Sequence, residues 1–241
     1  MRLDKFLSDC GCGTRREART LVRSGMVMVN GAAERNAGRQ VDETLDAVVC
    51  AGRQLVYVKY QYLMMNKPAG VVTATEDKHL PTVLDLVPDV YSHYRIFPVG
   101  RLDIDTTGLL LLTNDGELAH RLLSPKNHVD KTYWAIIQGR VDVMDAEAFA
   151  AGIVLDDGYR CMPARLTILK SAAQSEISVT IQEGKYHQVK RMFASVGKKV
   201  VRLKRVQMGS LSLDEALPEG GVRPLTAEEV ALLVKQSELC R

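Results

Sequence analysis

The stretch from Gly100 to Gly116, GRLDIDTTGLLLLTNDG, constrains the fold of this chain more than any other. It places two acids, Asp103 and Asp105, in a polar turn bounded by glycines, directly before the apolar run 109–112. An apolar run between turn signals is typical of a buried strand. We therefore expect the carboxylates at the end of a core strand, where a side chain is held rigidly enough for catalysis.

The rest of the chain shows strand and helix patterns in mixed order. Alternating or continuous apolar runs predict further strands at residues 26–29, 62–65, 70–75, 133–137, 164–169, 176–181 and 200–206. Helical spacing and capping signals predict helices at residues 2–10, 14–24, 82–86, 117–123, 145–151, after the turn at 183–187, and from 226 onward. Because strands often follow strands directly, the order favours an α+β fold over alternating βαβ units.

Composition indicates an ordinary globular protein without a membrane segment. The 241 residues are 46% hydrophobic and 25% charged, enough for one sizeable core and a small appendage. No apolar run approaches the roughly 20 residues of a membrane span, and the acid at Asp4 argues against a signal peptide. The cysteines are odd in number and scattered, which favours a reducing, cytoplasmic setting; they are Cys10, Cys12, Cys50, Cys161 and Cys240.

Positive charge is concentrated in two zones. Residues 1–40 hold eight basic side chains against four acids, and residues 184–205 hold eight basic side chains and no acid. Two basic zones on a chain whose net charge is only +3 predict that a polyanion is bound at two places.

The first basic zone contains a row of arginines on a predicted helix that opens with the capping box Thr14-Arg-Arg-Glu17. Arg15, Arg19 and Arg23 are four residues apart and share one face, with Arg16 beside them. A solvated surface would satisfy these charges, but Glu17 is the only acid interleaved with them, so we expect contact with RNA or DNA. The segment from RLDKFL to VMVNG, roughly the first 45 residues, also resembles the alpha-L RNA-binding module of a small-subunit ribosomal protein.

The residues leave several roles open for the two acids. The pattern D-x-D-x-T-G superficially resembles a calcium loop, but Asn114 stands where an EF-hand needs glutamate. Magnesium could be held by both acids, but no further carboxylate cluster accompanies them to complete such a site. A nucleophilic or basic carboxylate and an aspartate that caps a turn are the remaining readings. For Asp105 the turn role is favoured, whereas Asp103 is open on local grounds.

Four motifs together resemble the RsuA-type ribosomal RNA pseudouridine synthases. They are MNKPAGVVT at 65–73, the GRLD stretch at 100–116, KTY at 131–133 and EGKYHQVKRMF at 183–193. They occur in the family's order and spacing, and with the N-terminal module they cover nearly the entire chain. The resemblance implies an α+β fold in two parts: an S4-like RNA-binding domain and linker at 1–58, then a catalytic domain at 59–241 with a mixed, mainly antiparallel sheet flanked by helices.

The resemblance also implies roles for particular residues in a cofactor-free isomerisation of uridine. Asp103 takes the place of the essential aspartate, Tyr133 stacks on the target base, and Lys190 forms the ion pair that keeps Asp103 charged. Arg101 supports the flipped nucleotide and Ile181 packs against its base. The remaining predicted RNA contacts are basic side chains, namely Lys185, Arg191, Arg15, Arg16, Arg19 and Arg23. His187, at the turn into a helix, is expected to be a structural hydrogen-bonding residue.

The expected partner is small-subunit 16S rRNA, at uridine 516 by family resemblance, or an assembly intermediate of that subunit. We expect a cytoplasmic monomer that needs no cofactor or metal and contacts no membrane. Three alternatives stay open: a synthase acting on 23S rRNA, a non-catalytic RNA-binding or ribosome-assembly factor of the same fold, and a metal-dependent nuclease or transferase.

Overall fold

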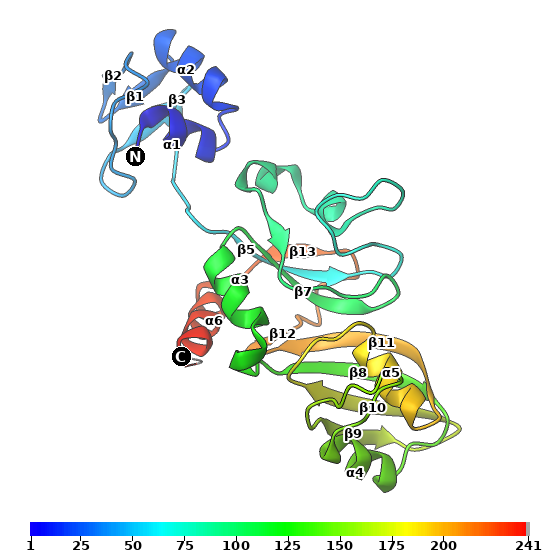
Figure 1. Cartoon of the computed structure of the whole chain (residues 1–241). Helices are drawn as coiled ribbons and strands as arrows, with labels where there is room; N and C mark the ends of the chain where they lie inside the picture. The colour runs from blue at the N-terminus through cyan, green and yellow to red at the C-terminus, as the bar shows by residue number, and fades with distance from the viewer. Residues whose placement is uncertain (240–241) are drawn as a thin grey trace. The chain divides into compact units, whose positions relative to one another are not determined.

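The computed structural model describes residues 1–239 and divides into two compact units. The first unit contains Met1–Gln61 together with Pro88–Ile96. The second contains Tyr62–Val87 and the chain from Phe97 onward. Figure 1 shows the elements of both units along the chain.

The first unit packs two helices on a small antiparallel sheet. Helices α1 (Leu3–Asp9) and α2 (Arg15–Arg23) bury one face each, and the predicted capping box of Thr14 and Glu17 opens α2. The sheet has the order β2-β1-β3-β4, with β1 at Val27–Val29, β2 at Ala32–Ala33, β3 at Val48–Cys50 and β4 at Arg53–Gln54. The predicted hairpin is confirmed by the pairing of β1 with β2 around Asn30 and Gly31.

The first unit also includes a segment that the sequence assigned to a loop of the catalytic domain. Residues 89–94 form the 3₁₀ helix η2 (Asp89–Tyr94), which contacts α1. The ring of His93 lies 3.1 Å from the place where a Cβ on Gly11 would stand, which leaves little space for a larger residue there. The contact joins residues about eighty positions apart, so no local pattern could have predicted it. The expected division at residue 58 therefore differs from the grouping that the contacts define.

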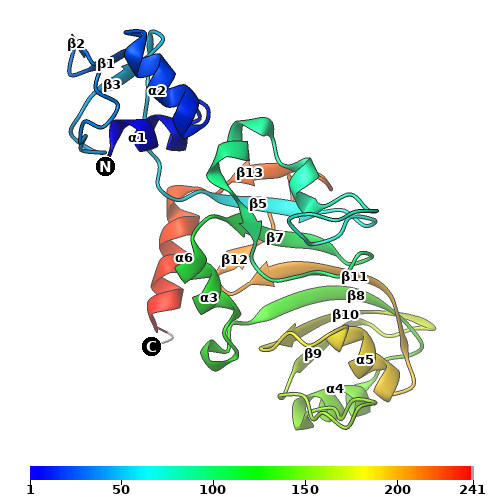
Figure 2. The same cartoon turned by 45° about the horizontal axis from the view of Figure 1, so that its top comes forward.

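The second unit is built on a nine-stranded mixed sheet, seen in two views in Figures 1 and 2. Its main order is β13-β5-β7-β11-β8-β10-β9, with β6 paired to β7 and β12 paired to β11. The β7–β11 pair is parallel and the other pairs of this sheet are antiparallel. The strands are β5 Tyr62–Lys67, β6 Phe97–Pro98, β7 Thr107–Thr113, β8 Lys131–Gln138, β9 Arg165–Lys170, β10 Gln174–Ile181, β11 Lys199–Met208, β12 Leu211–Ser212 and β13 Val222–Pro224. The expected α+β fold with a mainly antiparallel sheet is confirmed.

The leucine run forms the centre of the sheet, as predicted. β7 lies between β5 and β11, and residues 108–113 are all buried. Leu109 and Leu111 pack with apolar side chains of α3 (Gly116–Leu123) and with Leu233 of α6 (Ala227–Leu239). Burial of these side chains in one core fixes the strand that follows Asp103.

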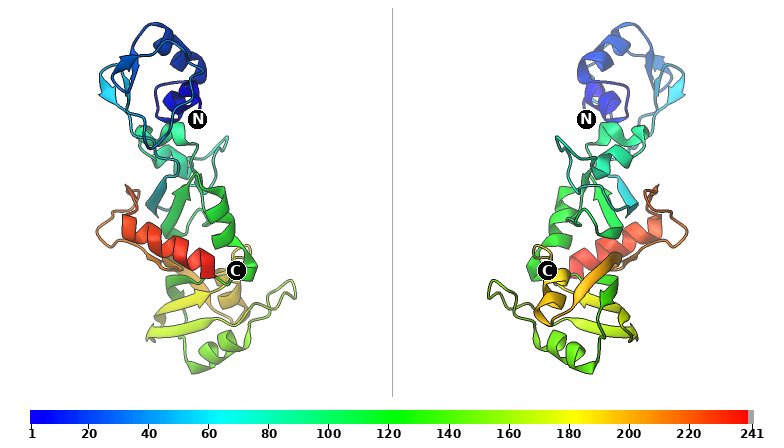
Figure 3. Two further views of the ribbon diagram at one scale, coloured as in Figure 1. Left: turned by 90° about the vertical axis from the view of Figure 1, so that its left-hand side faces the viewer. Right: turned by 90° about the vertical axis from the view of Figure 1, so that its right-hand side faces the viewer.

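The four helices of this unit form two pairs. Helices α3 and α6 contact one another, as Figure 3 shows from two sides. Helix α4 (Val143–Ala151) contacts β9 and helix α5 (Gln188–Ser195) contacts β11, and Phe149 of α4 packs with Phe193 of α5 with ring centroids 4.8 Å apart. Two further 3₁₀ helices, η1 (Val83–Leu86) and η3 (Pro125–Asn127), complete the described elements. The predicted cap of the last helix is also present, since Thr226 and Glu229 bond each other's backbone N–H groups.

One predicted strand is wrong. Residues 70–75 form no named strand, only an isolated bridge between Val72 and Thr82. The segment is held by a few backbone hydrogen bonds, such as Gly70 N–H to the Ile104 carbonyl at 2.8 Å, and by the Thr73 hydroxyl, which donates to the Leu102 carbonyl at 2.8 Å. This contact ties the segment to the loop that carries Asp103.

The structure also gives the states of the cysteines and the helix lengths. Four of the five cysteines are free thiols, and Cys240 lies outside the described residues. Within residues 1–239, the helices are all too short or too polar to cross a bilayer.

Candidate active site

Asp103 sits on a loop that a buried lysine holds in place. Lys67, at the end of β5, is fully buried, and its Nζ donates to the carbonyl oxygens of Asp103 and Thr106 at 3.1 Å and of Pro68 at 3.0 Å. Burial lowers the pKa of Lys67 to about 8. In the sequence Lys67 follows the expected strand 62–65 and was assigned no role, although a lysine just after an apolar strand was a usable signal.

Lys190 of α5 reaches both acids of the loop. Its Nζ lies 2.9 Å from an Asp103 oxygen and 2.5 Å from an Asp105 oxygen. Burial lowers the pKa of Lys190, but its hydrogen bonds to Asp105 and Asp103 outweigh that effect and raise it overall. The structure brings Lys190 to Asp103 as the resemblance implied.

Asp105 is more than the turn residue that the sequence favoured. Burial opposes its ionisation, but the hydrogen bond and the charge of Lys190 outweigh burial, so the pKa of Asp105 lies below its ordinary value. Its side chain is 66% exposed, compared with 25% for Asp103. Asp105 therefore shares the cation at the surface, while Asp103 faces the pocket.

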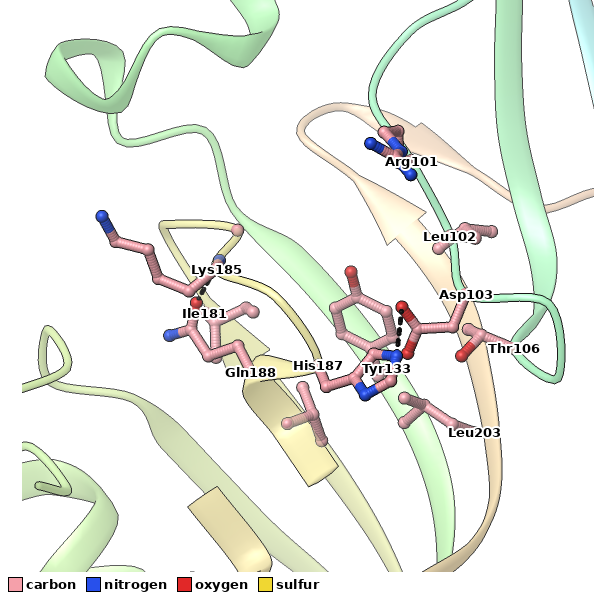
Figure 4. Close-up of a pocket in the computed structure, with 12 residues that line it drawn as sticks. Arg101, Leu102, Asp103, Thr106, Tyr133, Ile181, Lys185, His187, Gln188 and Leu203 are labelled. Carbon is pink, nitrogen blue, oxygen red and sulfur yellow. Dashed lines mark hydrogen bonds and ion pairs between the residues drawn. The ribbon is translucent and has the colours of Figure 1, made fainter. Parts of the chain in front are cut away.

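His187 also faces Asp103, although only a structural hydrogen-bonding role was expected for it. Its Nε2 lies 3.6 Å from an Asp103 oxygen, a contact that Figure 4 marks with a dashed line. The residue has a left-handed backbone (φ 49°) directly before α5, and its ring stacks on Tyr186 with centroids 3.8 Å apart. A non-glycine residue in this conformation is uncommon and is often found at functional sites.

Tyr133 forms one wall of the pocket beside Asp103 (Figure 4). It is 8% exposed on β8, and its neighbours in the pocket are Ile181 of β10 and Leu203 of β11. Ile181 and Leu203 line a small pocket of about 70 Å³ with Asp103, Tyr133 and His187. The last three residues also line an adjoining cavity of about 770 Å³, a size typical of ligand sites. A flat ring wall with apolar neighbours and one carboxylate suits a planar base attached to a sugar.

Of the other predicted contacts of the catalytic domain, Arg101 and Lys185 line this pocket and Arg191 does not. Arg101 is exposed at its rim, and the Lys185 ammonium lies 4.5 Å from the centroid of the Tyr159 ring. Arg191 points elsewhere, because its guanidinium is paired with Asp156 and Asp157 beside a neighbouring hollow. Its predicted phosphate contact would need those pairs to open.

In the first unit, the sequence suggested that no acid besides Glu17 compensates the arginine row, but Asp4 also does so. Asp4 of α1 is fully buried among three guanidiniums, at 2.9 Å from Arg19 and 3.1 Å from Arg2 and Arg15. The hydrogen bond from Arg2 is the largest of the effects that lower the pKa of Asp4. One carboxylate among three cations still leaves two positive charges, and these arginine side chains are about half exposed. Asp4 thus orders a positive surface, to which Arg16 and Arg23 add exposed charges.

Among the described residues, no group of three or more His, Cys, Asp or Glu side chains is arranged to hold a metal ion. Asp103 and Asp105 instead form ion pairs with the Lys190 ammonium.

Comparison with known proteins places this geometry in a family. A family model described as RNA pseudouridylate synthase matches residues 61–195, and an S4 domain model matches residues 1–46. An uncharacterised RNA pseudouridine synthase of Bacillus subtilis is 46% identical, covering 97% of this chain and 98% of that protein. A ribosomal small subunit pseudouridine synthase A of Vibrio cholerae is 43% identical, covering 98% and 100%.

A solved structure agrees with the sequence comparisons. The crystal structure of a pseudouridylate synthase superposes with a TM-score of 0.68 at 39% identity, covering 97% of this chain and 99% of the other. The match of family, domain order and fold extends over nearly the whole chain. This protein belongs to the RNA pseudouridylate synthase family and carries an S4 domain at its N-terminus.

Proposed function

We propose that this protein converts a specific uridine of small-subunit ribosomal RNA to pseudouridine. The observation that carries the proposal is the arrangement of Asp103, which lies 2.9 Å from the Lys190 ammonium and lines one pocket with Tyr133. The choice of RNA rests on relatives that are named ribosomal small subunit pseudouridine synthase A, each about 40% identical over nearly the full chain.

The reaction needs only groups that side chains provide. The C1′–N1 bond breaks, the C1′–C5 bond forms, C5 loses its proton and N1 gains one. No atom is added and nothing is oxidised or reduced, so a cofactor is not required.

Asp103 is the group that we assign to the sugar. An ionised carboxylate can attack C1′ or remove a proton from the ribose, and both routes need the negative charge that the Lys190 ammonium stabilises at 2.9 Å. Tyr133, Ile181 and Leu203 hold the base by apolar and stacking contacts while it turns. The same carboxylate therefore serves whichever route the sugar follows.

The RNA must deliver its uridine by base flipping, at a cost of a few kcal/mol. Arg101 at the rim and Lys185 on the loop before α5 are placed to hold backbone phosphates. The half-exposed arginines of the first unit hold a second RNA segment. Because Asp103, Tyr133 and Lys190 come from one chain, a monomer is sufficient for the reaction. We place the enzyme in the cytoplasm together with its rRNA substrate.

The role of Asp103 is tested by comparing Asp103→Asn with Asp105→Asn. Release of tritium from carbon 5 of labelled uridine in rRNA measures turnover directly. We expect Asp103→Asn to lose about 10³-fold or more, because the asparagine amide is neither nucleophile nor base, while Asp105→Asn retains measurable turnover. Equal activity of Asp103→Asn and the unmodified protein would exclude the assigned role.

The target is tested by mapping pseudouridines in rRNA from cells that lack this protein. Loss of a single pseudouridine from 16S rRNA is the expected result. A loss from 23S rRNA would reassign the substrate. If no pseudouridine is lost and the purified protein binds RNA without releasing tritium, the chain is a binding or assembly factor.

A further inference from the structure

Two buried cations line the cavity that contains Asp103 and Tyr133. Arg205 of β11 is 2% exposed and Lys131, the first residue of β8, is 8% exposed. Neither has a place in the function proposed above. Charged side chains are almost never buried this deeply without a partner of opposite charge.

Among the described residues neither cation forms an ion pair with a carboxylate, and the only opposite charge that acts on Lys131 is that of its chain neighbour Asp130. Lys198 of the same unit, by contrast, is paired with Asp145 at 2.5 Å. Lys131 donates to the Val129 carbonyl at 2.7 Å and Arg205 Nε to the Leu109 carbonyl at 2.8 Å.

One nitrogen of the arginine is left unsatisfied. Arg205 Nη2 is buried and has no hydrogen-bond partner among the described residues. Burial, followed by the charge of Arg205, lowers the pKa of Lys131 to about 8. Leaving a charged donor without an acceptor costs free energy, and such sites are frequently functional.

The register of the sheet puts both cations beside the base-stacking wall. Arg205 is the cross-strand partner of Tyr133, and Lys131 is the cross-strand partner of Ile181. Residues two apart on a strand face the same side, so Lys131 and Tyr133 share one face of β8. The cations therefore lie beside the wall on which the base would stack. They are placed to meet either the edge of that base or the phosphate of the same nucleotide.

We propose that Lys131 and Arg205 form a subsite for an anionic oxygen of the target nucleotide. This proposal rests on the proposed function. Two sources share that chemistry. When the C1′–N1 bond breaks with its electron pair on N1, the detached uracil carries a negative charge spread over its carbonyl oxygens, until C5 attacks C1′. A backbone phosphate of the flipped nucleotide is the other source.

A structural role predicts different behaviour. The bond from Arg205 to Leu109 joins β11 to β7, whose direct pairing is limited to two residue pairs. If joining the strands were the whole role, loss of either cation would lower stability and leave catalysis by the folded protein intact.

The test compares Lys131→Met, Lys131→Arg and Arg205→Lys with the control Lys170→Met, a change at an exposed position of β9 in the same sheet. Thermal unfolding selects conditions in which every variant is folded. RNA affinity and the single-turnover rate of pseudouridine formation are then measured. We expect Lys131→Met to lose about 10- to 100-fold in affinity or rate, Lys131→Arg and Arg205→Lys to lose less, and Lys170→Met to lose neither.

A substrate with neutral methylphosphonate linkages on both sides of the target uridine separates the two sources. If the subsite takes phosphate, the unmodified protein binds this neutral substrate more weakly or converts it more slowly than the natural one. Lys131→Met then has no further effect on affinity or rate. If it takes the oxygens of the base, the loss of rate in Lys131→Met persists with the neutral substrate. Folded Lys131→Met with unchanged affinity and rate would overturn the subsite, whereas an inactive unmodified protein would overturn the proposed function itself.

Discussion

At the scale of single residues, the site depends on one cation that serves two acids. Lys190 Nζ contacts Asp103 and Asp105 at 2.9 and 2.5 Å, and the acids lie on a loop whose carbonyls Lys67 holds. The sequence could predict Asp103 and Lys190 because their motifs resemble a known family. It could not predict that Lys67 holds the loop or that His187 faces Asp103, because both contacts arise only when distant segments fold together.

Lys190→Met should lower turnover more than RNA affinity. The substitution removes the positive charge beside Asp103 but no exposed phosphate contact, since the Lys190 side chain is only 23% exposed. We expect single-turnover pseudouridine formation to fall by about 10- to 100-fold and the dissociation constant for rRNA to change by less than about threefold. Lys185→Met is the comparison, with the larger effect in affinity. Equal losses of rate and affinity in Lys190→Met would contradict the assignment of its charge to Asp103.

At the scale of elements, local patterns predicted most helices and strands. The capping box of α2, the hairpin at Asn30 and the leucine strand β7 are all specified by residues close in sequence. The failures involve distant partners. In residues 70–75, Thr73 bonds the Leu102 carbonyl, and η2 packs on α1. Asp4 belongs to the same class, because nothing in its local sequence shows that it is buried among Arg2 and two arginines of α2.

The arginines of the first unit should divide into two groups when each is changed to glutamine. Arg23→Gln and Arg16→Gln remove exposed charges, so each should reduce the slope of log affinity against log salt by about 0.7–0.9 without loss of stability. Arg19→Gln should reduce the slope and also lower the free energy of unfolding by about 1 kcal/mol, because buried Asp4 loses a partner at 2.9 Å. Fluorescence titrations with an rRNA fragment and denaturant unfolding measure the two effects. A salt slope that none of these changes alters would exclude RNA binding by this surface.

At the scale of the molecule, buried ionisable groups set how the stability of the second unit varies with pH. Burial lowers the pKa of Lys67 and of Lys131 from 10.5 to about 8, so between these values the unfolded chain binds more protons than the folded one. The free energy of unfolding must therefore rise as pH increases above 8. Cys161 acts in the opposite direction above pH 9, because burial raises its pKa to about 11.

We expect the second unit to gain about 1–3 kcal/mol between pH 8 and pH 9.5, with most of the gain before Cys161 begins to oppose it. Trp134, the only tryptophan, lies on β8 three residues after Lys131, so its fluorescence in denaturant titrations reports this unit. Lys131→Met should remove about half of the gain, because Lys67 supplies the rest. The control Lys170→Met replaces an exposed lysine and should keep the full pH dependence. A stability that falls from pH 8 to pH 9 in the unmodified protein would mean that these lysines are not desolvated in solution.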